Sequence, residues 1–308
     1  MRIGIGGGGG TIDAAVESVR QAKDDGYSSA WFSNIFGLDG MTACAIAGRE
    51  VPDITLGTFV VPTYSRHPLY MAQQAMSTQA AAGGRFILGI GLSHQIVIEG
   101  ILGLSFEKPA RHMREYLEVL MPLLEHGTVE HTGDVYRVNN TFGPLERMGT
   151  TPPKVVVAAL GPVMLRLAGR LTDGTATWMT GPQTIADHIV PTIREAASEA
   201  SRPAPMVIAG VPVAVTDDPA AARAEAETVF AIYGTLPSYR AMLDREGAAG
   251  PGDIALVGDE DTVRQGIQRY AEAGVTDLNV APFGDVERTA SLIRTLLVGA
   301  AIDRNTAP

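Results

Sequence analysis

The sequence predicts an α/β protein whose strands close into one (β/α)8 barrel, the TIM-barrel architecture. Eight short apolar segments alternate with segments of helical periodicity along the 308 residues. Gly or Pro stands at most of the boundaries, as expected where strands turn into helices and helices end. Strict alternation favours a parallel sheet covered by helices, and eight such units favour a closed barrel over a doubly wound sheet. The apolar fraction of 45% is sufficient for one large core.

Each element has its own sequence signal. The predicted strands are rich in β-branched and small apolar residues, as strands buried on both faces are. They cover residues 2–5, 28–32, 54–61, 86–90, 154–159, 175–178, 206–215 and 276–281. The predicted helices cover residues 12–25, 39–50, 69–82, 109–126, 163–171, 183–200, 219–233, 259–274 and 285–301. Thr11 and Asp259 are suitable N-caps, and Gly83 and Gly274 stand just past helix ends.

Two segments interrupt the barrel pattern. Residues 128–142 alternate in polarity and contain Gly133-Asp134, which predicts a β-hairpin inserted between barrel units. Residues 236–256 contain Pro237 and Gly250-Pro251-Gly252, and they are too long for an ordinary connection. We expect them to form an irregular lid or insertion. Residues 1–308 are thus expected to form a single barrel domain with two insertions.

Composition excludes several classes of function. A net charge of −10 argues against a nucleic-acid partner, which would require a basic surface. Cys44, the only cysteine, lies in an apolar helical run and is expected in the core. The six histidines lack metal-ligand spacing, and the Gly-x-Ser-x-Gly pattern of Ser–His–Asp hydrolases is absent. No signal peptide or 18-residue apolar run is present, so we expect a cytoplasmic protein that acts on a small molecule, without metal or membrane.

In a parallel barrel, the site lies where the strands end. The glycines at 6–10 follow the first strand and suggest a dinucleotide fingerprint, but five consecutive glycines lack its spacing. A side-chain-free floor is favoured, with Gly7 beside the substrate. Trp178 and Met179 follow the sixth strand and are expected to contact the substrate; burial of Trp178 in the core is the alternative.

A family resemblance rests on the third and fourth strands. Val60-Val61-Pro62 is followed by Arg66-His67-Pro68 and then by Gly-Gly-Arg-Phe-Ile-Leu-Gly-Ile-Gly at 83–91. This ordered set resembles the bacterial-luciferase-like flavin and deazaflavin oxidoreductases, and is most similar to their coenzyme F420-dependent branch. The resemblance spans nearly the whole chain. It implies a homodimeric barrel that transfers a hydride between C5 of F420 and a small organic substrate. An FMN-dependent monooxygenase and a catalytically silent, cofactor-binding barrel remain as alternatives.

The resemblance also implies where the cofactor lies. Its ring would lie against the third strand's exit, where a non-proline cis peptide is expected between Thr58 and Val61. An ordinary buried strand is the alternative there. Small residues and a helix N-terminus at 158–162 also suit a cofactor side chain and phosphate, unless this is a tight turn that binds nothing. The implied cofactor-binding residues are Ser33, Thr58, Phe59, Val60, Val61, Leu92, Ser93, Ala158, Ala159, Leu160, Gly161 and Pro162.

Two residues are candidates for catalysis. His94 falls where some deazaflavin-dependent relatives place an acidic proton donor, and an imidazole can exchange a proton near neutral pH. A histidine hydrogen-bonded in the barrel mouth is the alternative. Relatives that act on sugars or alcohols often show Asp-His where this chain has Ser33-Asn34. Asn34 cannot act as a base but can orient a carbonyl group or the cofactor, which favours an activated alkene or imine as substrate. Arg66 and His67 are expected to brace the third-strand loop or to touch the cofactor tail.

Overall fold

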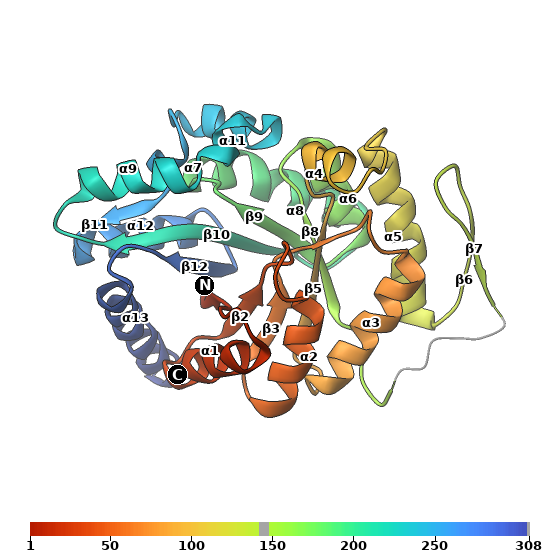
Figure 1. Ribbon diagram of the computed structural model, residues 1–308, viewed down its shortest axis with the longest axis horizontal. Helices are drawn as coiled ribbons and strands as arrows, with labels where there is room; N and C mark the ends of the chain where they lie inside the picture. Colours follow the sequence, from red (N-terminus) through yellow and green to blue (C-terminus); the bar gives the residue numbers. More distant parts are fainter. Residues whose placement is uncertain (142–147, 307–308) are drawn as a thin grey trace.

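Eight parallel strands close into a barrel, which confirms the predicted fold class (Figure 1). The computed structural model describes residues 1–141 and 148–306, with side chains up to residue 298. Each strand pairs with the next along the chain, and β12 pairs with β1 to close the ring. The barrel strands are β1 (Arg2–Gly6), β2 (Ser29–Phe32), β3 (Thr55–Thr58), β5 (Phe86–Gly91), β8 (Lys154–Ala158), β9 (Gly174–Trp178), β10 (Met206–Val215) and β12 (Asp277–Pro282).

Two short strands extend the sheet beyond the predicted eight. β4 (Val61–Pro62) pairs with β5, and β11 (Leu256–Gly258) pairs with the far end of β10. The predicted third strand at 54–61 is therefore interrupted. β3 ends at Thr58, the peptide bond between Phe59 and Val60 is cis, and β4 resumes at Val61. The expected cis peptide is thus confirmed and located, and the alternative of an ordinary continuous strand is wrong.

Helices surround the barrel. Thr11 accepts a hydrogen bond from the backbone N–H of Ala14, and Asp259 accepts one from Thr262, which confirms both predicted caps. A π-helical turn, Ile185–Ile189, joins two of the helices into the one predicted at 183–200. The helices on the barrel surface are α1 (Ile12–Asp24), α2 (Gly40–Glu50), α3 (Pro68–Ala81), α5 (Pro109–His126), α6 (Pro162–Leu171), α7 (Pro182–Thr184), α8 (Val190–Glu199), α9 (Pro219–Val229), α12 (Glu260–Glu272) and α13 (Val286–Thr306).

The segment expected to form a hairpin does so. β6 (Val129–Thr132) and β7 (Arg137–Asn140) pair antiparallel and project from the barrel at the right of Figure 1. Their turn is held by the buried Glu115 of α5, whose carboxylate accepts hydrogen bonds from the backbone N–H groups of Val135 (2.7 Å) and Tyr136 (3.0 Å). Phe142, the last residue of the predicted hairpin, lies outside the described residues.

The prediction of an irregular segment at 236–256 is wrong. After α10 (Ala231–Thr235), the chain forms α11 (Pro237–Glu246), a 3-10 turn (Pro251–Asp253) and then β11. Pro237 occupies the first helical position, where its missing N–H costs nothing. Gly247 is left-handed, with φ 74°, and ends the helix. The residues that suggested a loop therefore mark helix boundaries.

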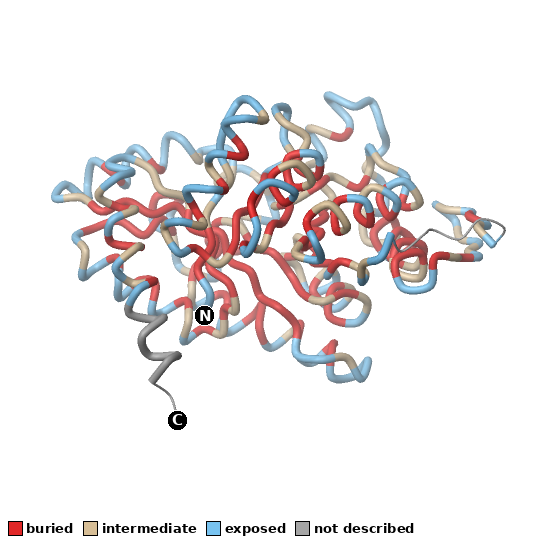
Figure 2. Tube along the Cα trace, turned by 90° about the horizontal axis from the view of Figure 1, so that it is seen from below, coloured by how far each residue is buried: buried red, intermediate tan, exposed pale blue. Residues whose placement is uncertain are grey.

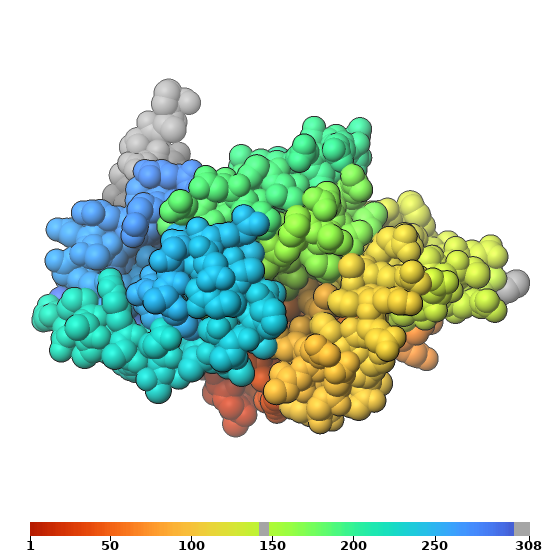
Figure 3. Space-filling view, turned by 90° about the horizontal axis from the view of Figure 1, so that it is seen from above, coloured from red at the N-terminus to blue at the C-terminus, as the bar shows by residue number. Residues whose placement is uncertain are grey.

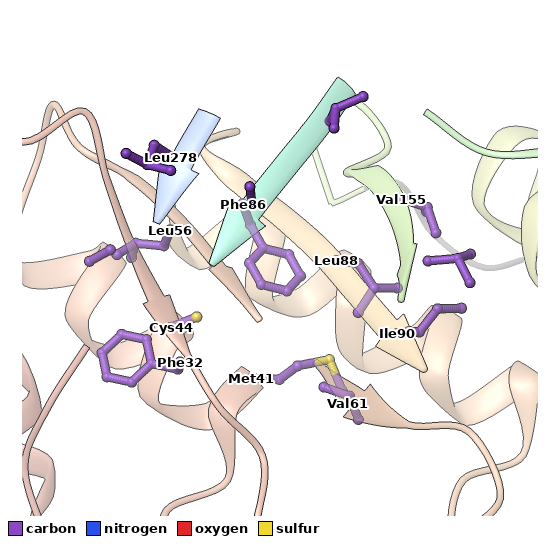
Figure 4. Close-up of a cluster of buried hydrophobic side chains, with 14 of the residues drawn as sticks. Phe32, Met41, Cys44, Leu56, Val61, Phe86, Leu88, Ile90, Val155 and Leu278 are labelled. Atoms are coloured by element: carbon purple, nitrogen blue, oxygen red, sulfur yellow. The ribbon is translucent and has the colours of Figure 1, made fainter. Parts of the chain in front are cut away.

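Two apolar cores lie inside and outside the barrel wall. Figure 2 shows the buried strands at the centre, and Figure 4 shows Leu56 of β3 beside Cys44 of α2 in the outer core. Cys44 lies in this outer core, as predicted. Inside the barrel, Trp31 packs with Ile87 and other apolar residues, under the half-buried Phe59 and Val60. Among the described helices, none has both the length and the apolarity needed to cross a membrane.

Candidate active site

The exit of β3 forms an apolar platform at the barrel mouth. Thr58 fixes it to β5, because its hydroxyl donates to the Gly89 carbonyl (2.8 Å) and accepts from the Gly89 N–H (2.9 Å). Beyond Thr58, the Phe59 ring lies edge-on to Trp31, at 6.2 Å between ring centroids. Phe59 and Val60 pack on the inner core and remain partly exposed. We call Phe59 and Val60 the platform; it offers an apolar surface to a flat ring.

Glycines on neighbouring strands make room for the platform. A Cβ at Gly91 would lie 2.8 Å from Cγ2 of Val60, and one at Gly210 would lie 2.9 Å from Cζ of Phe59. Either would force a side chain to move. Gly210 lies inside β10, and the sequence analysis did not assign it to the site. A glycine within a buried strand can mark a close approach by another residue, and that was the available signal.

The exit of β5 carries the candidate proton donor. Leu92, Ser93 and His94 are half-buried, and Ser93 has a left-handed backbone with φ 60°. Burial lowers the pKa of His94, so its imidazole is neutral near pH 7. The ring lies 5.9 Å from that of Tyr239, and no hydrogen bond holds it within the described part of the chain. The alternative of a histidine fixed by hydrogen bonds is therefore not what the structure shows.

The exit of β2 is largely occupied by capping interactions. The Asn34 side-chain oxygen accepts a hydrogen bond from the Gly40 N–H (2.9 Å), at the first position of α2. Its amide nitrogen remains available to orient a ligand. Ser33 is exposed beside it. Arg66 forms an ion pair with Asp39, the N-cap of α2, so its role is to brace this loop.

His67 also has a structural role. It is the N-cap of α3, and its Nδ1 accepts a hydrogen bond from the Leu69 N–H (3.2 Å). Bracing is therefore the interpretation that the structure supports for both Arg66 and His67.

The exit of β8 offers small residues and backbone donors. Ala158 is half-buried. A Cβ added at Gly91 would lie 3.1 Å from the Cβ of Ala158, so the exit of β8 adjoins that of β5. Ala159 is buried, and the Leu160 carbonyl is hydrogen-bonded to Nε2 of His188 (2.8 Å). Gly161 and Pro162 then begin α6, whose N-terminus has no side-chain cap. Its free N–H groups can bind an anion.

The exit of β9 forms an aromatic corner that the sequence reveals only in part. Trp178 is half-buried, and its ring lies 6.5 Å from that of Phe59 and 6.2 Å from that of Tyr233. The indole therefore belongs both to the core and to the mouth. Tyr233 and Tyr239 come from α10 and α11, which the sequence analysis treated in part as irregular. The available signal was their spacing: Tyr233 follows Phe230 by three residues, and Tyr239 follows Tyr233 by six.

Two further candidates contribute less to the mouth than expected. Met179 is buried with Leu243 and Ile254, and its 1% exposure argues against substrate contact. Gly7 is half-buried, and a Cβ there would lie 2.7 Å from the Phe32 ring. Gly7 thus allows close packing against Phe32, whereas a Cβ at Gly6, Gly8 or Gly10 would meet nothing within 4 Å.

Together these exits surround a hollow at one end of the barrel. Figure 3 looks onto this end and shows the hollow between the α9–α11 lobe, in cyan and blue, and the α4 (Gln95–Gly100) and α5 lobe, in yellow. The described residues contain no group of three His, Cys, Asp or Glu side chains that could hold a metal ion. An apolar platform, a neutral histidine and backbone N–H groups that can bind an anion suit a flat cofactor that carries a phosphate.

Comparisons with known proteins agree with this geometry. Residues 2–277 match the family described as luciferase-like monooxygenase. The chain is 26% identical to a 5,10-methylenetetrahydromethanopterin reductase of Methanopyrus kandleri, over 89% of this chain and 91% of that one. It is 27% identical to a putative coenzyme F420-dependent oxidoreductase of Mycobacterium tuberculosis, over 90% and 92% of the two chains.

Solved structures share the fold. The coenzyme F420-dependent tetrahydromethanopterin reductase of Methanopyrus kandleri superimposes with a TM-score of 0.79 at 23% identity, over 97% of this chain and 99% of that one. At this identity the superposition shows the fold alone. The family match covers most of the chain and confirms the resemblance seen in the sequence. The chain belongs to the luciferase-like monooxygenase family.

Proposed function

We propose that this chain is an F420-dependent oxidoreductase that transfers a hydride between the deazaflavin and a small organic substrate. The platform carries the proposal, because Phe59 and Val60 present a half-exposed apolar surface at the barrel mouth. The names of the two curated relatives, one of them described as F420-dependent, support the choice of cofactor. An acidic chain without a metal-ligand cluster in its described residues is consistent with organic redox chemistry.

The residues present fit the cofactor. Phe59 and Val60 would support the ring, Leu92 and Ser93 would lie along it, and the uncapped N-terminus of α6 at Gly161 would bind phosphate. Ser33, Ala158, Leu160 and Pro162 complete the proposed set. Thr58, Val61 and Ala159 are at most 1% exposed, so they would support the site from within the fold rather than touch the cofactor. When bound, F420 supplies hydride transfer at its C5. The protein orients the ring and excludes water from it.

In this proposal His94 moves the proton that accompanies the hydride. Its lowered pKa leaves the imidazole neutral near pH 7, with one ring nitrogen free to take a proton from solvent and pass it to the substrate when the hydride is delivered. Asn34 would contribute a hydrogen bond from its amide nitrogen, while its oxygen accepts from the first N–H of α2. Because Asn34 cannot act as a base, the β2 exit suits substrates that are reduced directly, such as an activated alkene or an imine.

Binding of F420 and of FMN, followed by fluorescence, tests the proposal. We expect tight binding of F420 and weak binding of FMN. Val60→Asp should abolish binding, because a carboxylate would be desolvated against an apolar ring at a cost of a few kcal/mol. The exposed Val298 provides the matched control, and Val298→Asp should bind normally. Preference for FMN would instead favour an oxygen-using monooxygenase, and binding of neither would contradict the proposal.

Turnover of the F420-loaded protein tests His94. His94→Ala should lower kcat roughly 10²-fold or more while leaving the Kd for F420 nearly unchanged. The exposed His126 provides a control outside the mouth, and His126→Ala should keep wild-type kcat. Tight F420 binding without turnover of any substrate by the wild type would favour the silent, cofactor-binding barrel.

We also propose a homodimer, which sedimentation equilibrium would test.

A further inference from the structure

Three aromatic side chains line one side of the mouth above the platform. Trp178, at the end of β9, has its ring 6.2 Å from that of Tyr233 in α10. The Tyr233 ring lies 4.9 Å from that of Tyr239 in α11, and Tyr239 lies 5.9 Å from the ring of His94. We call Trp178, Tyr233 and Tyr239 the aromatic wall. It leads from the platform to the candidate proton donor.

The aromatic wall is uncharged. Burial raises the pKa of both tyrosine hydroxyls, so they remain neutral donors at physiological pH. The arginine that follows the wall, Arg240, donates to the carbonyl oxygens of Ala248 (2.7 Å) and Ala249 (2.8 Å). Arg66, near the β3 exit, forms an ion pair with Asp39. Arg240 also forms an ion pair with Asp244, so neither guanidinium is free to neutralise a substrate anion.

Apolar side chains continue outward from the mouth. Ile35 and Phe36, in the loop after β2, are 69% and 70% exposed. Ile96 of α4, after β5, is 66% exposed, and Ile101 beyond it is 60% exposed. Both segments follow strand ends at the same end of the barrel as the platform. Large exposed apolar side chains at the mouth of a barrel suit the binding of an apolar molecule.

These observations concern the substrate, and the inference rests on the proposed function. We propose that the aromatic wall makes the site selective for uncharged, flat, conjugated substrates and against anionic ones. Such a substrate would stack against Tyr239 and Trp178, as aromatic rings do in offset or edge-to-face contacts. A carboxylate or phosphate would lose its hydration there without gaining Arg66 or Arg240 as a partner.

Equilibrium dialysis of the F420-loaded protein tests this selectivity. Methyl cinnamate and cinnamate share a ring and a conjugated double bond but differ in charge, and they serve as probes. We expect the ester to bind at least about tenfold more tightly than the acid. Tyr239→Ala should weaken ester binding roughly tenfold, and Tyr239→Phe less than about threefold, because the ring is kept. Tyr70, exposed on α3, provides the control, and Tyr70→Ala should bind as wild type does.

The outcomes separate this inference from the proposed function. Equal affinities for the two probes, no ester binding, or wild-type ester affinity in Tyr239→Ala would each overturn the role of the aromatic wall. The absorbance of retained F420 is read in the same dialysis. Ester selectivity in a protein that does not retain F420 would support the wall and contradict the cofactor proposal. Retained F420 without preference for the ester would support the cofactor proposal and contradict the role of the aromatic wall.

Discussion

Acidification should destabilise the protein through His112, a histidine of α5 buried beside the β4–α3 loop. Its side chain is 5% exposed, its Nε2 lies 3.0 Å from the Thr63 hydroxyl, and the Tyr64 ring stacks on it at 3.9 Å. Burial lowers the pKa of His112 from 6.5 to about 4, against the opposing effect of the nearby Glu115 carboxylate. Protonation therefore favours the unfolded chain.

The sign and size of the change in the free energy of unfolding follow from the difference between the folded and unfolded pKa values of His112. Since the folded pKa is below the unfolded one, the stabilisation from His112 is complete above pH 6.5. It is lost as the pH falls from 6.5 towards 4. Between pH 7.5 and 5.0, this one group should cost about 2 kcal/mol of the free energy of unfolding. Most carboxylates are still ionised at pH 5.0, so their contribution over this interval is small.

Urea unfolding at the two pH values would measure the effect in wild type and in His112→Gln. The variant is less stable at both pH values, so the comparison concerns the pH-dependent change alone. His112→Gln should lose about 2 kcal/mol less than wild type on acidification. His126→Gln, at an exposed position, should lose as much as wild type. Equal losses in His112→Gln and wild type would refute the reasoning.

Three further changes test the fold around the site. Thr58→Val removes both hydrogen bonds to Gly89 and should cost about 1–3 kcal/mol in urea unfolding; an unchanged midpoint would show that the clamp contributes nothing. Gly57→Ala places a methyl group against the Trp31 ring and should cost roughly 1–3 kcal/mol of the free energy of unfolding. A melting temperature equal to that of the wild type would show that the ring can move aside. Glu115→Gln weakens the hydrogen bonds that hold the hairpin turn, so amide exchange at 134–136 should accelerate; unaltered protection would contradict this anchoring role.

The sequence alone determined most of the fold. Strand and helix signals are local, because buried parallel strands are apolar throughout and helices carry their own caps, such as Thr11 and Asp259. Eight such units then have few ways to close. Pro237 suggested a loop but begins α11, since residues typical of loops also mark helix ends and only packing decides between the two.

The site divides in the same way. The sequence determined which residues follow strand ends, and a closed parallel barrel necessarily brings those ends to one mouth. It thereby placed His94 and the platform near each other. Only the tertiary structure decided that the Asn34 oxygen caps α2, that Met179 is buried and that Tyr239 reaches His94. These facts depend on contacts between segments distant in the chain, which no local pattern of residues can encode.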